Sequence, residues 1–265
     1  MMARPDQPRP GAGRGPSGAP EALGCQEHAD RGPRREAAPQ ATDAMSLARL
    51  MTWLSPAFPV GGFSYSHGLE WVVETGQLRD AARLGDWIED VLVHGAGRSD
   101  AIFLAHAWRA VSAGNAVRLE EVAELAAAFA VSAERRLETL AQGTAFLAAV
   151  QAVWPQPALA ALQDANEVAY PVAVGACAAA HGLPLRATAQ AFTQAFAANL
   201  VSAGVRLIPL GQTDGLRVLA RLEGLLVASV EQALVMHLAD VGGATILVDI
   251  ASMRHETQYT RLFRS

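Results

Sequence analysis

Histidines are the side chains of this chain best suited to bind a metal or to transfer protons. There are seven: His28, His67, His94, His106, His181, His237 and His255. None lies four residues from another, and none adjoins a pair of cysteines, so their spacing does not predict a metal site within one chain. His94 and His106 fall on separate expected helices and could approach each other. Most such histidines instead lie at a surface or satisfy a local hydrogen bond.

Other catalytic arrangements also lack the residues they require. Ser64 and Ser66 lie close to His67 in sequence, but no Gly-x-Ser-x-Gly elbow is present. The chain contains no lysine, since all 21 basic residues are arginine, and this excludes a Walker phosphate loop and a Schiff-base enzyme. Residues 211–215 (GQTDG) precede an expected helix and could bind an anion. Helix capping by Thr213 or Asp214 is favoured, because Asp214 would repel an anion there. We therefore predict no catalytic residue, no metal ligand and no stably bound cofactor.

The stretch 59–70, PVGGFSYSHGLE, does not follow the helical pattern around it. Gly61 and Gly62 permit backbone angles closed to other residues. Phe63 and Tyr65 then place apolar area on a loop, where proteins often meet partners. A tight corner with both aromatics in the core is an equal alternative. The hypothesis is that Phe63 and Tyr65 pack at a dimer or partner interface, with the two glycines allowing the turn.

The end of the sequence is a second unusual stretch. Residues 253–265, MRHETQYTRLFRS, combine arginines with three large apolar side chains. Such clusters anchor protein interfaces, and Tyr259, Leu262 and Phe263 are costly to leave in water. We expect a flexible C-terminal tail, residues 254–265, that orders on a partner.

Between these stretches the apolar residues recur at helical spacing. Helices are expected over residues 45–54, 66–75, 80–94, 99–111, 118–131, 132–153, 158–180 and 186–205, and from the loop at residues 209–215 to about residue 237, with Ser99 and Ser132 as caps. Residues 158–180 should bend near Tyr170 and Pro171, and the state of residues 241–250 is left open. No strand alternation or internal repeat is evident. The fold class is therefore all-α, a single-domain helical bundle of roughly ten helices with short connections.

Composition separates residues 1–44 from residues 45–265. The first segment holds half of the 14 prolines and almost no large apolar residue, so we expect a disordered tail. It has no secretory-signal pattern, and Met45 is a plausible alternative start. The remaining residues carry the net charge of −5, which gives no support to nucleic-acid binding. With two cysteines and no apolar span, the expectation is a cytoplasmic protein that does not enter membranes.

Three separated segments resemble the UreF family of urease accessory proteins. They are residues 54–70 (LSPAFPVGGFSYSHGLE), 199–215 (NLVSAGVRLIPLGQTDG) and 254–264 (RHETQYTRLFR), and residues 132–139 (SAERRLET) match a fourth motif imperfectly. The resemblance covers about residues 45–265. His67 stands where the family commonly has glutamine, and Leu200 follows Asn199 where glutamine is usual.

The resemblance implies a non-enzymatic protein required for nickel insertion into urease. It implies a homodimer in a complex with the UreD/UreH scaffold, the UreG GTPase and apo-urease, in which nickel is handled in transit and the GTPase is regulated. Arg261 is then the expected GTPase-recruiting residue. The partner-binding residues expected from motif and resemblance are Gly61, Gly62, Phe63, Tyr65, His67, Arg254, His255, Glu256, Tyr259, Arg261 and Phe263.

Two other functions stay open from the sequence. One is a small helical-bundle enzyme with a histidine and carboxylate pocket, for which Glu70, Glu74, His94 and His106 would be the candidates. Turnover by the purified protein alone would support it. The other is a metal carrier that binds nickel between protomers through histidines, which nickel titration of the isolated dimer would distinguish from transit.

Overall fold

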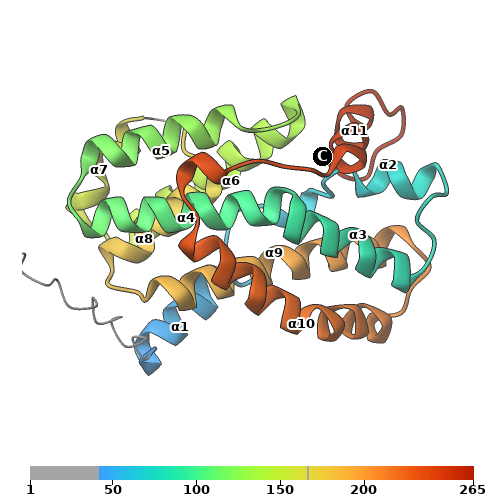
Figure 1. Ribbon diagram of the computed structural model, residues 1–265, viewed down its shortest axis with the longest axis horizontal. Coiled ribbons are helices and arrows are strands. Elements are labelled where there is room, and N and C mark those ends of the chain that lie inside the picture. Colours follow the sequence, from blue (N-terminus) through green and yellow to red (C-terminus); the bar gives the residue numbers. More distant parts are fainter. Residues whose placement is uncertain (1–41, 166) are drawn as a thin grey trace, which may run out of the picture. The chain divides into compact units, whose positions relative to one another are not determined.

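The computed structural model describes residues 42–165 and 167–265, and within them the fold is all-α (Figure 1). These residues form eleven α-helices and three short 3₁₀ helices, without a strand in the described ranges. The predicted fold class is confirmed. The expected disorder of residues 1–44 falls almost wholly outside the described residues. The α-helices are α1 Ala44–Trp53, α2 Leu69–Glu74, α3 Ala81–His94, α4 Ala96–Ser112, α5 Ala116–Ala128, α6 Ala133–Val153, α7 Ala160–Asp164, α8 Tyr170–Ala180, α9 Leu185–Leu207, α10 Gln212–Val235 and α11 Ile246–His255; the 3₁₀ helices are η1 Gly62–Ser64, η2 Pro157–Leu159 and η3 Leu238–Asp240.

Helices α4 and α8 form the most extensive packing in the fold. Eight consecutive residues of α8, Pro171–Ala178, are buried, most of them small. A Cβ at Gly175 would lie 2.3 Å from the backbone oxygen of Leu104, so the two helices approach too closely there for a side chain. Small residues therefore set the distance between α4 and α8.

Two apolar clusters divide the core. One joins α4, α6 and α8 to α1, with Trp53 and Phe146 in edge-to-face contact at 5.6 Å between ring centroids. The other joins α3, α9 and α10, through buried residues such as Leu84, Leu200 and Leu222. Helix α9 has buried residues in both clusters, so it links the two halves of this bundle.

The helix boundaries test the caps and start points expected from the sequence. The side chain of Ser132 accepts from the N–H of Arg135 at 3.1 Å, which confirms Ser132 as the cap of α6. Ser99 is not a cap, because α4 begins three residues earlier and its hydroxyl donates to the Gly242 carbonyl at 3.3 Å. Helix α2 begins at Leu69 rather than at residue 66, because His67 and Gly68 both have positive φ angles.

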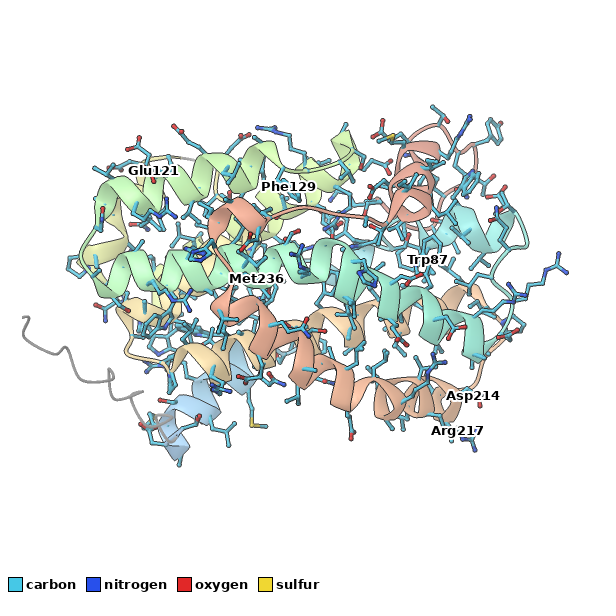
Figure 2. The ribbon with its side chains drawn as sticks, viewed as in Figure 1. Trp87, Glu121, Phe129, Asp214, Arg217 and Met236 are labelled. Atoms are coloured by element: carbon cyan, nitrogen blue, oxygen red, sulfur yellow. The ribbon has the colours of Figure 1, made fainter. Side chains whose placement is uncertain are left out.

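Residues 211–215 cap a helix as expected, but neither Thr213 nor Asp214 is the N-cap residue, because α10 begins before them at Gln212. Gly211 is the N-cap of α10, and the Asp214 carboxylate accepts from the Gly211 N–H at 3.1 Å. Asp214 also pairs with Arg217 at 2.7 Å, and Figure 2 shows both side chains at this end of α10. A carboxylate in the first turn stabilises the helix through its dipole.

Within the part of the chain that the structure describes, no helix combines the length and the apolar character needed to cross a membrane. Residues 241–250, left open by the sequence, connect η3 to α11 and enter that helix at Ile246. Helix α11 lies beside α2 (Figure 1).

Candidate functional site

The glycine-aromatic loop forms a corner between α1 and α2. Gly61 has φ +71°, in the left-handed region that favours glycine, whereas Gly62 does not. A Cβ at Gly62 would meet only ordinary contacts at 3.8 Å or beyond. The turn therefore depends on Gly61, and the expectation that both glycines are needed for it is wrong for Gly62.

The two aromatics of this loop have different surroundings. Phe63 is 66% exposed, whereas Tyr65 is only 3% exposed and lies beneath the Arg264 guanidinium. In this arrangement only Phe63 is accessible to a partner. An interface role for either residue stays a prediction.

His67 is the strained residue of the loop. Its φ of 56° is unusual for a residue with a side chain, and a Cβ at the next residue, Gly68, would lie 2.6 Å from the Ser252 nitrogen. The His67 ring is buried, with Nε2 2.8 Å from Glu138 Oε1 and 2.7 Å from Arg135 Nη1. Burial and the Arg135 charge lower the pKa of His67.

The C-terminal segment, residues 256–265, is bound to the domain by carboxylates of α2 and α6. Glu70 accepts from the backbone N–H groups of Leu262 at 2.6 Å and Phe263 at 2.9 Å. Phe263 is 4% exposed, and the Arg206 guanidinium stacks on its ring, with Cζ 4.4 Å from the ring centroid. The sequence predicts a flexible segment that orders on a partner; the structure instead shows it ordered on its own domain, because Glu70 satisfies its N–H groups.

A second carboxylate, Glu134, connects α6 to α11 and to this segment. Glu134 Oε1 accepts from Arg261 Nη1 at 2.6 Å, and its Oε2 lies 2.7 Å from His255 Nδ1. The other ring nitrogen of His255 lies 3.1 Å from Glu70 Oε2. His255 is fully buried, so it joins the two carboxylates at the base of the segment.

Glu138 is the most heavily partnered carboxylate of the group. It accepts from Gln142 at 3.0 Å and from the Ser265 hydroxyl at 2.8 Å, besides its contacts with His67 and Arg135. Burial alone would raise the pKa of Glu138, but the Arg135 charge and the His67 contact outweigh burial and lower that pKa to about 2. The carboxylate is therefore ionised, and its charge is balanced inside the fold.

We name Glu70, Glu134 and Glu138 the acidic clasp. Of the eleven predicted partner-binding residues, His67, His255, Arg261 and Phe263 contact or directly adjoin this clasp. Glu256 accepts from the Ala133 N–H at 2.8 Å, while Arg254 and Tyr259 are exposed, and Tyr259 is fully so at 103%. The clasp thus joins two of the sequence motifs, residues 54–70 and 254–264.

Comparison with known proteins now decides the family. A UreF family profile matches residues 78–223. A urease accessory protein UreF of Rhodopseudomonas palustris strain BisB5 is 58% identical over 227 residues, covering 85% of this chain and 93% of that protein. The UreF proteins of Bradyrhizobium diazoefficiens and Xanthobacter autotrophicus are 54% and 52% identical, over 85% and 95% of this chain and 95% and 100% of theirs, in that order.

The chain belongs to the UreF family. The resemblance drawn from the sequence motifs is confirmed, and the relatives are named as urease accessory proteins rather than as enzymes.

The residues proposed for a helical enzyme do not converge on one pocket. Glu70 is engaged in the acidic clasp, and Glu74 accepts from Gln258. His106, on α4, has its Nε2 3.1 Å from the Met236 carbonyl oxygen, whereas the side chain of His94 is exposed. Among the described residues, no group of three or more His, Cys, Asp or Glu side chains is placed to hold a metal ion.

Several residues of this UreF-family site were missed by sequence reasoning. Glu134, Arg135 and Glu138 lie on α6, and only the imperfect match of residues 132–139 to a family motif pointed toward them. Asp100 lies on α4 beside a run of apolar residues, AIFLA, and an acid so placed signals burial. Its surroundings involve residues far away in sequence, which spacing does not reveal.

Proposed function

We propose that the protein is a non-enzymatic urease maturation factor that bridges the UreD/UreH scaffold and the UreG GTPase on apo-urease. In this proposal it acts in the cytoplasm as a homodimer, regulates the GTPase, and gates nickel delivery without storing the metal. Membership of the UreF family supports the general role. The observation that carries the bridging role is the C-terminal segment, which the acidic clasp holds in one conformation while much of its apolar surface stays exposed.

This exposed surface continues along α11. Its members are large apolar side chains between 42% and 77% exposed, apart from the fully exposed Tyr259: Ile246, Leu247, Ile250, Met253, Tyr259 and Leu262. Removing such area from water contributes about 25 cal/mol per Å² before the costs of association are subtracted, and a surface ordered in advance loses little entropy on binding. We assign this surface to the scaffold protein.

The test is co-purification of residues 45–265 with UreD/UreH and UreG. Deleting residues 254–265 would also remove the buried Phe263, so the sharper variant is Tyr259→Ala combined with Leu262→Ala. We expect this double variant to fold normally and to lose the scaffold. Replacing the exposed Val117 and Leu216 by alanine, away from α11, is the matched control. Full retention of the scaffold by the double variant would refute the assignment.

Arg261 is the proposed contact for the GTPase. Its side chain is 41% exposed, and Glu134 fixes one of its nitrogens, which leaves further guanidinium donors for a partner carboxylate. Arg261→Ala should weaken GTPase recruitment and urease activation while scaffold binding persists. Arg217→Ala, on the exposed pair at the start of α10, should change neither. Normal GTPase pulldown and normal urease activation by Arg261→Ala would exclude this role.

The homodimer is assigned to the loop that carries Phe63, the exposed aromatic of the corner. Phe63→Ala should shift sedimentation toward the monomer, whereas Gly62→Ala should leave assembly unchanged, because there is room for its Cβ. If Phe63→Ala still forms the dimer, the loop is only a turn between α1 and α2 and does not contribute to the dimer interface. Nickel titration of the isolated protein separates transit from storage, since a carrier would bind stoichiometric metal.

A further inference from the structure

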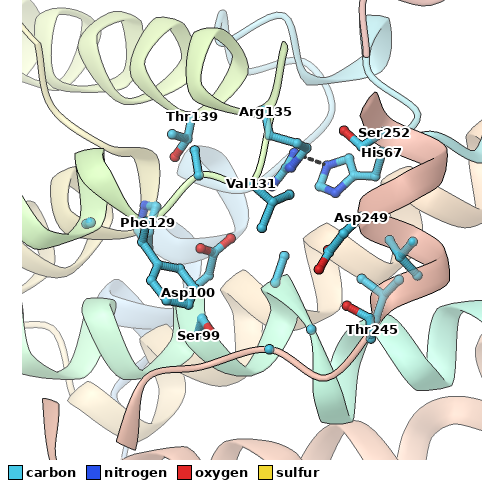
Figure 3. A pocket seen from close by; sticks show the side chains of 18 of the residues that line it. His67, Ser99, Asp100, Phe129, Val131, Arg135, Thr139, Thr245, Asp249 and Ser252 are labelled. Atoms are coloured by element: carbon cyan, nitrogen blue, oxygen red, sulfur yellow. Dashed lines mark hydrogen bonds between the residues drawn. The ribbon is translucent and has the colours of Figure 1, made fainter. Parts of the chain in front are cut away.

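Asp100 on α4 lies where two partly open cavities adjoin. The cavities have volumes of about 160 Å³ and about 210 Å³, and both are lined by His67, Asp100, Arg135 and Thr139. Figure 3 shows the Asp100 carboxyl group pointing into the first cavity, opposite His67 and Arg135. The acid therefore faces a space rather than a neighbouring side chain.

The side chain of Asp100 has no hydrogen bond and no ion pair within residues 42–165 and 167–265, unlike the carboxylates of the acidic clasp. The nearest cation, Arg135, donates to Glu138 and contacts His67, so its charge is already balanced. Burial raises the pKa of Asp100 from 3.8 to about 7, although the Arg135 charge acts in the opposite direction. A half-buried acid without a counter-charge of its own is expected to bind a proton or a cation.

The remaining lining of the first cavity is largely apolar. Phe103, Phe129, Val91, Val131 and Val248 contribute its walls, and Figure 3 shows Phe129 and Val131 beside Asp100. An apolar cavity of about 150 Å³ is large enough to hold a benzene ring. The cavity thus has the size and the surface for a compact hydrocarbon group, with the carboxyl group of Asp100 at one side.

The charges that face this cavity come from three elements. Asp100 comes from α4, Arg135 with its partner Glu138 from α6, and Asp249 from α11. Burial raises the pKa of Asp249, although Thr245 opposes this, and burial first and then Arg135 lower the pKa of His67. With Arg135 neutralised by Glu138 and His67 uncharged, the excess charge is negative.

We propose that this cavity binds an organic cation, an alkylammonium group on a compact apolar stem, with Asp100 as its counter-ion. The ammonium supplies the missing hydrogen-bond donors and charge, and the stem displaces water from the apolar walls. Mg²⁺ or Ca²⁺ suits the lining less well, since these ions take six or more oxygen ligands, whereas most of this surface is hydrocarbon.

Isothermal titration of the full chain with benzylamine at pH 8 tests the proposal. Benzyl alcohol, which has the same stem without the charge, and benzoate, which reverses the charge, are the matched probes. We expect saturable 1:1 binding of benzylamine, at least about tenfold tighter than either control probe. Equal binding of benzyl alcohol would overturn the proposal, because the carboxyl group would then contribute nothing.

The pH dependence gives a second readout. Below about pH 7 the proton on Asp100 must leave before the ammonium can pair with it, so affinity should fall about tenfold for each pH unit below that point. Proton release on binding should appear as a dependence of the measured heat on the buffer. An affinity that does not change between pH 6 and pH 8 would contradict pairing with Asp100.

Variants locate the site. Asp100→Asn keeps the size of the side chain and should reduce benzylamine affinity at least about tenfold, with thermal unfolding as the check that the protein folds. Asp249→Asn, which removes the other acid facing the cavity, should reduce affinity less. A larger loss in Asp249→Asn than in Asp100→Asn would overturn the assignment to Asp100.

Two sources could supply such a group, a free amine or a lysine side chain of another protein. Titration with N-acetyl-lysine methylamide distinguishes them: a free-amine site favours benzylamine, and a lysine-accepting site favours the lysine derivative. Either preference, lost in Asp100→Asn, supports the proposal. Tighter binding of Ni²⁺ than of both amines, also lost in that variant, would make Asp100 a metal ligand and refute it.

Discussion

The carboxylates of the acidic clasp have several side-chain or backbone partners, whereas the carboxyl group in the Asp100 cavity has none among the described residues. Glu138 has four side-chain partners, and its pKa lies at about 2. The Asp100 side chain lies close to the same Arg135 but has no hydrogen bond in the described part of the chain, and its pKa is raised to about 7. The shared arginine shows that burial alone does not set these values.

This difference in partners indicates a structural role for the clasp and a binding role for the cavity. A carboxylate with every oxygen satisfied fixes structure, because removing any partner leaves a buried charge. A carboxyl group that faces a cavity has its desolvation cost uncompensated, so it gains most from a ligand. The clasp accordingly holds the C-terminal segment, while the cavity is the place for a bound cation.

Of the substitutions that test this comparison, the removal of the Glu138 side chain should reduce the free energy of unfolding the most. Glu138→Ala leaves Arg135 buried without its partner and should lower the free energy of unfolding by about 3–5 kcal/mol. Urea denaturation at pH 7 measures the loss. Glu121→Ala, which breaks only an exposed pair with Arg118, should cost less than about 1 kcal/mol. Equal effects of the two substitutions would show that the clasp does not stabilise the fold.

Asp100→Asn should produce the next largest effect on the free energy of unfolding, and this effect depends on pH. The folded state retains the Asp100 proton between about pH 4 and pH 7 whereas the unfolded state loses it, so wild-type stability falls as pH rises through this window. At about 1.36 kcal/mol per pKa unit, the fall attributable to Asp100 amounts to a few kcal/mol.

The difference in unfolding free energy between Asp100→Asn and wild type isolates this contribution. Relative to wild type, the variant should gain stability from pH 4 to pH 7 and gain no more above that. Asp86→Asn, on the exposed pair with Arg221, is the control and should show little change. A difference that is constant with pH would mean that Asp100 is ionised throughout the range.

Glu70→Gln should have an intermediate effect confined to the C-terminal segment. Hydrogen bonds to a charged group contribute about 1.5–3 kcal/mol, and the amide loses the charge that attracts the N–H groups of Leu262 and Phe263. Hydrogen exchange should show reduced protection of these two amides, with α4 and α8 unchanged. Unchanged protection at both amides would show that Phe263 packing, and not Glu70, holds the segment.

Arg261→Ala should have the smallest effect on stability. The Arg261 side chain is 41% exposed, so solvent screens its pair with Glu134 and the cost should stay below about 1 kcal/mol. Thermal unfolding measures this, and Arg264→Ala is a matched comparison in the same segment. A loss above 2 kcal/mol would place Arg261 in the clasp's structural role and would weaken its assignment to GTPase recruitment.

The sequence by itself determined the family and most of the helices with their approximate boundaries, although it did not predict α11. Apolar residues at helical spacing and local caps such as Ser132 act within one or two turns, so they can be read from neighbouring residues. The motifs likewise located the two segments that meet at the clasp. The boundary errors, at Ser66 and Ser99, occurred where contacts with α11 and its preceding loop override the local signals.

Only the tertiary structure decided which acids are paired and which face a cavity. Glu70 meets Leu262 and Phe263 across more than 190 residues of sequence. Asp100 is set against Arg135 because α4 and α6 both pack against α8. Neither relation has a local signal, because pairing and burial depend on which distant segments the core brings together. The flexible segment expected from residues 254–265 became a bound one for the same reason: its partners lie on α2 and α6.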